Sequence, residues 1–109
     1  MDSDATPRLA RLTVAEIEAV IEGFCQLQVN LIVSKHFLKQ AAARGVTVTD
    51  AKRILTDGRI AGKQEWNDKF GDWTYGLRGT DVEGDELELR IGITPDRKAI
   101  VLVTVFEPN

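Results

Sequence analysis

The chain has 109 residues, which suits one domain with a hydrophobic core of its own. Apolar residues make up 43% and charged residues 28%, as in ordinary globular proteins, and the net charge of −3 argues against a nucleic-acid binder that relies on overall positive charge. Cys25 is the only cysteine, which excludes an intramolecular disulfide and a cysteine-based zinc cluster, and its apolar neighbours predict a buried thiol.

The first residues, Met1-Asp2-Ser3-Asp4, are acidic where a secretory signal is basic, and no long apolar run follows them. We therefore expect a cytoplasmic protein. Residues 1–11 contain Pro7 and no clear periodicity, which indicates a flexible tail. A single domain is predicted over residues 12–109.

The first predicted helix begins after Thr13, which can cap it in a capping box with Glu16. Its apolar residues recur at helical spacing and form one stripe: Ile17, Val20, Ile21 and Phe24. The following run, Val29–Val33, is short and partly β-branched, and it suits either an extended connector or an edge strand.

Two further helices are predicted before Gly58. Ser34 caps the second, which ends at Gly45, a residue suited to left-handed dihedral angles. Thr47 caps the third, with Asp50 in its first turn. The residues expected to face inward are Phe37, Leu38, Ala41 and Ala42 in the second helix and Val48, Ala51, Ile54 and Leu55 in the third.

After Gly58 the apolar period becomes that of strands. Strands are expected over residues 59–66, 73–78, 87–94 and 100–106, with a turn at Asn67-Asp68 and Gly71 and another at 94–97 around Pro95. The last strand is almost wholly apolar, which is typical of a central strand. The predicted fold is α+β, with N-terminal helices followed by a four-stranded antiparallel sheet.

His36 is the only histidine, placed in the first turn of the second helix with Lys39 and Gln40 on its own face. It is either a proton-transferring group or a surface or helix-packing residue. A lone histidine and a lone cysteine cannot assemble a zinc site, and the acids around Glu83 lack the spacing of a calcium loop. We expect no metal ion and no cofactor.

Two arginines are expected on the sheet face that points away from the helices. Strand alternation places Arg78 and Arg90 there, and Thr104 joins them if its strand alternates in the same sense. Paired arginines can hold a phosphate by forked hydrogen bonds, but they can equally be solvated strand residues near an acid such as Glu88.

Positive charge is concentrated between Ser34 and Lys63, a segment that contains seven Lys and Arg residues and only two acidic residues, both Asp. This segregation predicts either a basic patch on an otherwise acidic protein or two solvated helix faces. Lys35, Lys39, Arg44 and Lys52 are the candidates for holding a polyanionic backbone.

The stretch from Ser34 to Gly58 resembles a bacterial family of uncharacterised small domains, in which Ser-x-His precedes a basic residue, Arg-Gly-hydrophobic, an acidic helix start and a closing Gly. The resemblance spans residues 32–106. This family is usually grouped with the RelE- and BrnT-type toxins. The resemblance therefore implies the fold of those toxins, with N-terminal helices and a four-stranded antiparallel sheet, and their activity, which is RNA cleavage without a metal ion.

His36, Lys39 and Arg44 match the family motif, whereas Arg78, Arg90 and Thr104 come from strand geometry alone. The leading hypothesis is an endoribonuclease in which His36 is the acid or base, Arg78 and Arg90 stabilise the phosphate, and RNA and an antitoxin-like protein are the partners. The alternatives are a non-catalytic interaction module on the same scaffold, and a subunit that self-associates through the apolar stripe of its first helix.

Overall fold

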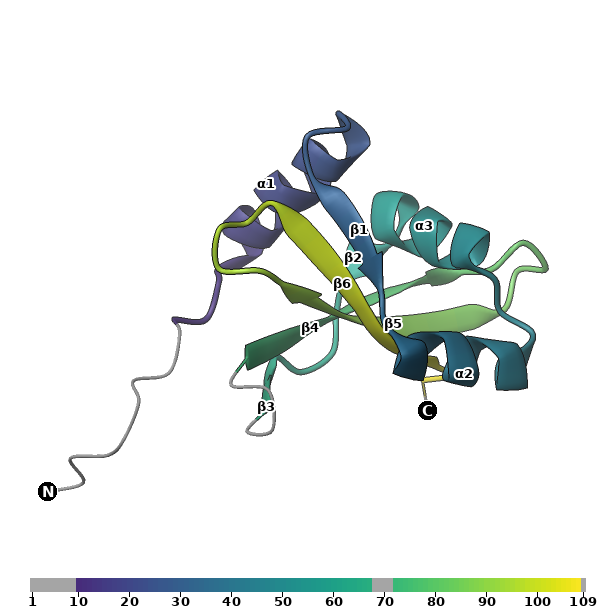
Figure 1. Cartoon of the computed structure of the whole chain (residues 1–109). Helices are drawn as coiled ribbons and strands as arrows, with labels where there is room; N and C mark the ends of the chain where they lie inside the picture. Colours follow the sequence, from purple (N-terminus) through teal and green to yellow (C-terminus); the bar gives the residue numbers. More distant parts are fainter. Residues whose placement is uncertain (1–9, 68–71, 109) are drawn as a thin grey trace, which may run out of the picture.

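The computed structural model describes residues 10–67 and 72–108, so the predicted flexible tail and the predicted Asn67–Gly71 turn lie largely outside the described residues. The helices are α1 (Val14–Cys25), α2 (Lys35–Arg44) and α3 (Val48–Asp57). The strands are β1 (Asn30–Val33), β2 (Arg59–Ile60), β3 (Glu65–Asn67), β4 (Asp72–Thr80), β5 (Glu86–Ile93) and β6 (Ala99–Phe106). Figure 1 shows α1 and α3 together on one side of the sheet and α2 beside the far end of β6.

The predicted helix starts are confirmed. Thr13 forms a capping box with Glu16, and Thr47 forms one with Asp50. The Ser34 hydroxyl accepts a hydrogen bond from the Phe37 amide, 3.0 Å away. At the other end of α2, Gly45 has a φ of 69°, which glycine adopts without steric cost.

The sheet has six strands among the described residues, so the prediction of four strands was wrong, although the α+β class is confirmed. The order is β1-β6-β5-β4-β2, and β3 also pairs with β4. The run Val29–Val33 contains an edge strand, β1, which pairs in parallel with β6, the last strand of the chain. The purely antiparallel prediction fails at this strand.

The other added strand comes from the division of the predicted strand at residues 59–66. Ile60 is opposite Leu77 and Glu65 is opposite Thr74, so four residues of one strand bridge two of its partner. Residues 61–64 therefore bulge out, and Gly62, with φ 81°, packs against the Glu88 side chain. This bulge covers part of the sheet face that lies opposite the core.

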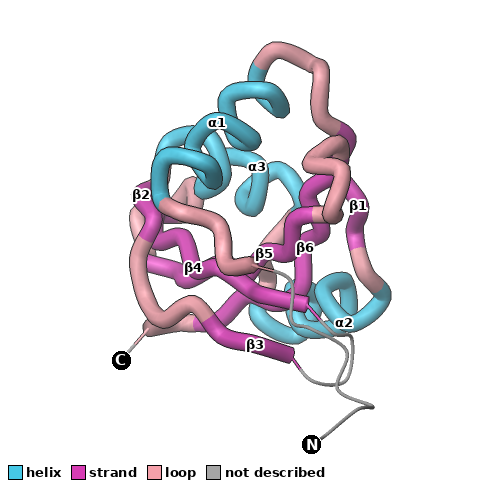
Figure 2. Tube along the Cα trace, turned by 90° about the vertical axis from the view of Figure 1, so that its left-hand side faces the viewer, coloured by secondary structure: helices cyan, strands magenta, loops and turns pink. Residues whose placement is uncertain are grey.

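One core joins the helices to the sheet, and the tube in Figure 2 shows the helical layer of α1 and α3 above the strands. β6 lies between β1 and β5, which confirms the prediction of a central strand. The largest fully buried side chains come from all three helices and from β4, β5 and β6: Phe37, Ile17, Ile54, Leu55, Leu77, Leu89, Ile91, Ile100, Leu102 and Val105.

Three burial predictions require correction. Cys25 is exposed because it follows Phe24 by one residue and so lies off the α1 stripe. Leu38 and Ala42 of α2 are exposed for the same reason, since Phe37 and Ala41 occupy the core-facing line. The α1 stripe packs against the core of this chain, with Ile17 fully buried and Ile21 and Phe24 partly buried. None of the described helices is long and apolar enough to cross a membrane.

Candidate functional site

The sheet face opposite the helices, called the open face here, carries the polar residues of the central strands. Pairing across the sheet places Thr74 of β4 beside Gly92 of β5, and Gly92 beside Val101 of β6. In the next row on the same face, Gly76 of β4 is paired with Arg90 of β5, and Arg90 is paired with Thr104 of β6. Paired residues point to the same face, so the sequence-based placement of Arg78, Arg90 and Thr104 on one face agrees with the register.

Arg78 and Arg90 converge, as predicted, but on a carboxylate. Arg78 Nε donates to Glu88 Oε1 at 3.0 Å, and Arg90 Nη1 donates to Glu88 Oε2 at 3.2 Å. Arg90 Nη2 also lies 3.2 Å from Glu65 Oε1 and donates to the Thr74 carbonyl and hydroxyl at 3.1 and 3.0 Å. We call these residues, Glu65, Thr74, Arg78, Glu88 and Arg90, the ion cluster.

The centre of the ion cluster is buried, and its outer members are not. The side chains of Arg90 and Glu88 are only 5% and 6% exposed, while that of Arg78 is 33% exposed. Gly76 leaves the room that the Arg90 guanidinium needs, because a Cβ there would lie 2.7 Å from Nη1. The hydrogen bonds of Arg90 are directed at protein groups, so this arginine braces the sheet and holds Thr74 in place.

A groove of about 530 Å³ lies on the open face next to the ion cluster. Gly92, Val101 and Val103 form its floor, since they lie on the two central strands. Its rim is polar except for Trp73 and comes from three places in the sequence: Ser34 and His36 at the start of α2, Asn67 at the end of β3, and Asp72, Trp73 and Thr74 at the start of β4. Thr74 therefore belongs to both the groove and the ion cluster.

His36 reaches the groove from the β6 side. β1 ends opposite Leu102, and the Ser34 hydroxyl donates to the Leu102 carbonyl at 2.8 Å, which fixes the start of α2 against β6. The buried Phe37 points into the core, so its neighbour His36 turns toward the open face and is exposed. The fold thus gives His36 a place at a groove, as its sequence context suggested.

Asp72 approaches the same groove from the β4 side, where it pairs with Asn67 across the β3–β4 hairpin. It is partly buried, and burial raises the pKa of its carboxyl above the ordinary value, against a smaller opposing effect of the Trp73 backbone amide. A carboxyl group of this kind keeps its proton to higher pH than a fully solvated one. The groove therefore brings together two groups suited to proton transfer.

The other predicted binding residues do not line this groove. Lys35 and Lys39 are exposed on α2 beside His36, and Lys39 shares its helix face. Arg44 closes α2, and Lys52 is exposed on α3 in the helical layer. Thr104 is the register partner of Arg90 and lies on the open face beyond the groove.

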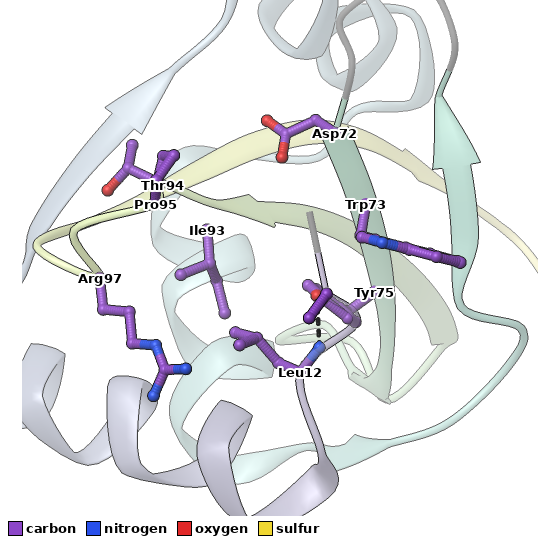
Figure 3. Close-up of a pocket in the computed structure, with 9 residues that line it drawn as sticks. Leu12, Asp72, Trp73, Tyr75, Ile93, Thr94, Pro95 and Arg97 are labelled. Atoms are coloured by element: carbon purple, nitrogen blue, oxygen red, sulfur yellow. Dashed lines mark hydrogen bonds between the residues drawn. The ribbon is translucent and has the colours of Figure 1, made fainter. Parts of the chain in front are cut away.

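A smaller hollow of about 200 Å³ lies where the chain enters α1 (Figure 3). The Leu12 amide donates to the Tyr75 hydroxyl at 3.0 Å, and Arg97 pairs with Glu16 at 2.8 Å. Burial raises the pKa of Tyr75, so its phenol stays protonated. Tyr75 and Arg97 are thus engaged in anchoring the start of α1, and we place no chemistry in this hollow.

Sequence reasoning missed most of the groove. Asp72, Asn67 and Gly92 gave no motif, because they meet only through the β3–β4 hairpin and the pairing of β4 with β5. Glu88 was detectable: its position two residues before Arg90 on the same face signalled an ion pair. In the described residues, no three His, Cys, Asp or Glu side chains come together so as to hold a metal ion.

Comparison with known proteins gives one result. No curated protein and no solved structure matches the chain. One family model matches residues 33–107, close to the span of 32–106 over which the sequence resembles a family of uncharacterised domains, and that match carries no connection to the RelE- or BrnT-type toxins. The matched region runs from the end of β1 through β6 and so includes His36, the groove and the ion cluster. The chain belongs to the family described as Domain of unknown function (DUF4258).

Proposed function

We propose that the chain is a toxin-like endoribonuclease that cleaves RNA without a metal ion, with the groove as its active site. The observation that carries the proposal is that His36 and Asp72 line one groove from its two sides. Residues 34–58 carry the Ser-x-His motif on which the expectation of a toxin-like ribonuclease was based, and His36 of that motif lines the groove. The family assignment alone does not reach this far, because its description names no activity.

The chemistry would be attack of a ribose 2′-hydroxyl on the adjacent phosphorus. His36 would accept the 2′-hydroxyl proton as the new O–P bond forms, and the carboxyl group of Asp72 would donate a proton to the 5′-oxygen as the old O–P bond breaks. The products are a 2′,3′-cyclic phosphate and a 5′-hydroxyl. Lys35 and Lys39, exposed beside His36, would hold the phosphate backbone.

The roles first expected of the arginines change in this scheme. Arg90 is buried and committed to Glu88, Glu65 and Thr74, so we assign it to positioning the Thr74 side of the groove. Arg78 is the more exposed of the two, and only its Nε is engaged with Glu88 in the contacts described above. Arg78 does not line the groove, so neither arginine is assigned to the substrate phosphate.

The test is cleavage of a mixed RNA substrate in the presence of a chelator by wild type, His36→Ala, Asp72→Asn and Gln28→Ala. Gln28 is exposed and lies outside the groove, which makes it a control for purification and folding. We expect losses of about 100-fold or more for the first two variants and none for the control, since general acid–base catalysis contributes on that order. Equal cleavage by wild type and His36→Ala would remove the active-site assignment.

A second candidate, a non-catalytic interaction module, is favoured by the ion cluster. Glu65 and Glu88 neutralise Arg78 and Arg90, so the open face presents less free positive charge than an RNA-binding surface usually has. In this reading the groove or the free edge of β1 takes a segment of a protein partner, as an antitoxin-like peptide would. Wild-type protein that leaves every RNA intact but binds such a peptide would decide for this candidate.

A further inference from the structure

Gly92 is a glycine that the fold does not require. It lies inside β5, at the centre of the sheet, where a residue without a side chain weakens the strand. Its φ is not in the left-handed region, and a Cβ added there would meet nothing closer than the Val101 side chain at 3.8 Å. That distance is an ordinary van der Waals contact, so a larger residue could occupy this position.

The neighbouring glycine makes the contrast clear. A Cβ at Gly76, on the adjacent strand, would come within 2.3 Å of the Ala61 carbonyl and 2.7 Å of Arg90 Nη1, so close packing demands glycine there. The register shift between β5 and β6 does not explain Gly92 either, because the extra residue is Val103 on β6. Because Gly92 has no side chain, the space that a side chain would fill at this position is left to the groove.

The shape and chemistry around that space suit a flat, partly polar ring. Gly92 is itself buried and lies between Val101 on one strand and Thr74 on the other, so the row is an apolar strip with a hydroxyl at one side. Arg90 Nη2 donates to the Thr74 hydroxyl at 3.0 Å and so fixes its position. The volume of about 530 Å³ is in the range that accommodates one small ligand.

We infer that Gly92 forms the floor of a nucleobase subsite, in which one base of single-stranded RNA lies flat over Gly92 with its edge toward Thr74 and its ribose toward His36. This inference rests on the proposed function and names the part of the RNA that the groove grips. Charge favours this occupant, because Lys35 and Lys39 lie beside His36, where the phosphates would follow. Arg90 acts in it as a positioning residue, through Thr74.

The experiment is a titration of the isotope-labelled chain with 5′-AMP, 5′-UMP and ribose 5-phosphate, followed through backbone amide shifts. We expect both nucleotides to move the amide signals of Thr74, Gly92 and Val101, and ribose 5-phosphate, which lacks a base, to leave them in place. Gly92→Val fills the floor and should weaken nucleotide binding by about tenfold or more. The same variant should resist denaturant at least as well as wild type, because valine suits a strand better than glycine.

Thr80→Val is the matched control, since Thr80 is exposed at the end of β4 and outside the groove. If Gly92→Val does not fold, Gly92→Ala replaces it, with an expected weakening of about threefold. Unchanged nucleotide binding by the Gly92 variant, identical shifts with ribose 5-phosphate, or no groove shifts at millimolar nucleotide would each overturn the subsite. RNA cleavage that survives in Gly92→Val would overturn it while leaving the ribonuclease intact, whereas base-dependent binding without cleavage would support the subsite and remove the ribonuclease.

Discussion

Replacing Glu88 by leucine tests how the open face is held together. Glu88 is 6% exposed and accepts hydrogen bonds from Arg78 at 3.0 Å and from Arg90 at 3.2 Å. Without it, Arg90, itself 5% exposed, retains only Glu65 as a charged partner, and that side chain is 64% exposed. A buried charge that loses its main partner costs about 3–5 kcal/mol, so Glu88→Leu should lose that much of its free energy of unfolding.

The double variant Glu88→Leu/Arg90→Met separates the loss of attraction from the cost of an unpaired charge. It replaces the buried pair with apolar side chains of similar size, which is often neutral or stabilising in proteins. We therefore expect the double variant to be more stable than Glu88→Leu alone, by about 2 kcal/mol or more. Urea unfolding of wild type, both single variants and the double variant gives the four free energies.

The exposed pair Arg59–Glu86 provides a matched control. It joins β2 to β5 at 3.4 Å, but its side chains are 64% and 48% exposed. Water screens such a pair, so Glu86→Gln should change the free energy of unfolding by less than about 1 kcal/mol. The reasoning fails if Glu88→Leu costs no more than Glu86→Gln, or if the double variant is less stable than either single one.

Three further predictions concern the fold. The backbone amide of Thr47 lowers the pKa of Asp50, so Asp50 contributes stability at neutral pH that is lost as the pH falls below about 4. In urea unfolding near pH 7, Asp50→Ala should lower the free energy of unfolding by about 1–2 kcal/mol. A difference from wild type that persists unchanged near pH 2 would contradict this prediction. Cys25 is exposed, so a thiol reagent should modify the native protein as fast as the unfolded one, whereas strong protection would show a buried thiol. Phe37 is 0% exposed, so Phe37→Ala should lower the free energy of unfolding by about 3–5 kcal/mol, and a loss below about 1 kcal/mol would mean that α2 does not seal the core.

Local signals predicted most of the secondary structure. Thr13, Ser34 and Thr47 marked helix starts because capping depends on residues three positions apart. Strand alternation placed Arg78 and Arg90 on one face for a similar reason: the period of two is local. Helix caps and strand alternation can be predicted from the sequence because the residues that form them are neighbours in the chain.

Features that depend on long-range pairing could not be predicted in the same way. The parallel pairing of Asn30–Val33 with Ala99–Leu102 joins segments that are far apart in the chain, and residues 61–64 bulge only because β2 and β3 pair with one strand at offset registers. The groove depends on both features, since β1 sets the position of His36 and β3 supplies Asn67. His36 was identified from its type, but its companion Asp72 was not.

The most direct test of the proposed active site is an analysis of the ends of a cleaved oligonucleotide. Wild-type protein in a chelator should convert an all-ribose substrate into fragments with a 2′,3′-cyclic phosphate and a 5′-hydroxyl, and 2′-deoxy substitution at the cleaved nucleotide should abolish the reaction. His36→Ala should form these products about 100-fold more slowly or worse. Cleavage that tolerates the deoxy substitution, requires added metal or proceeds unchanged in His36→Ala would contradict the account.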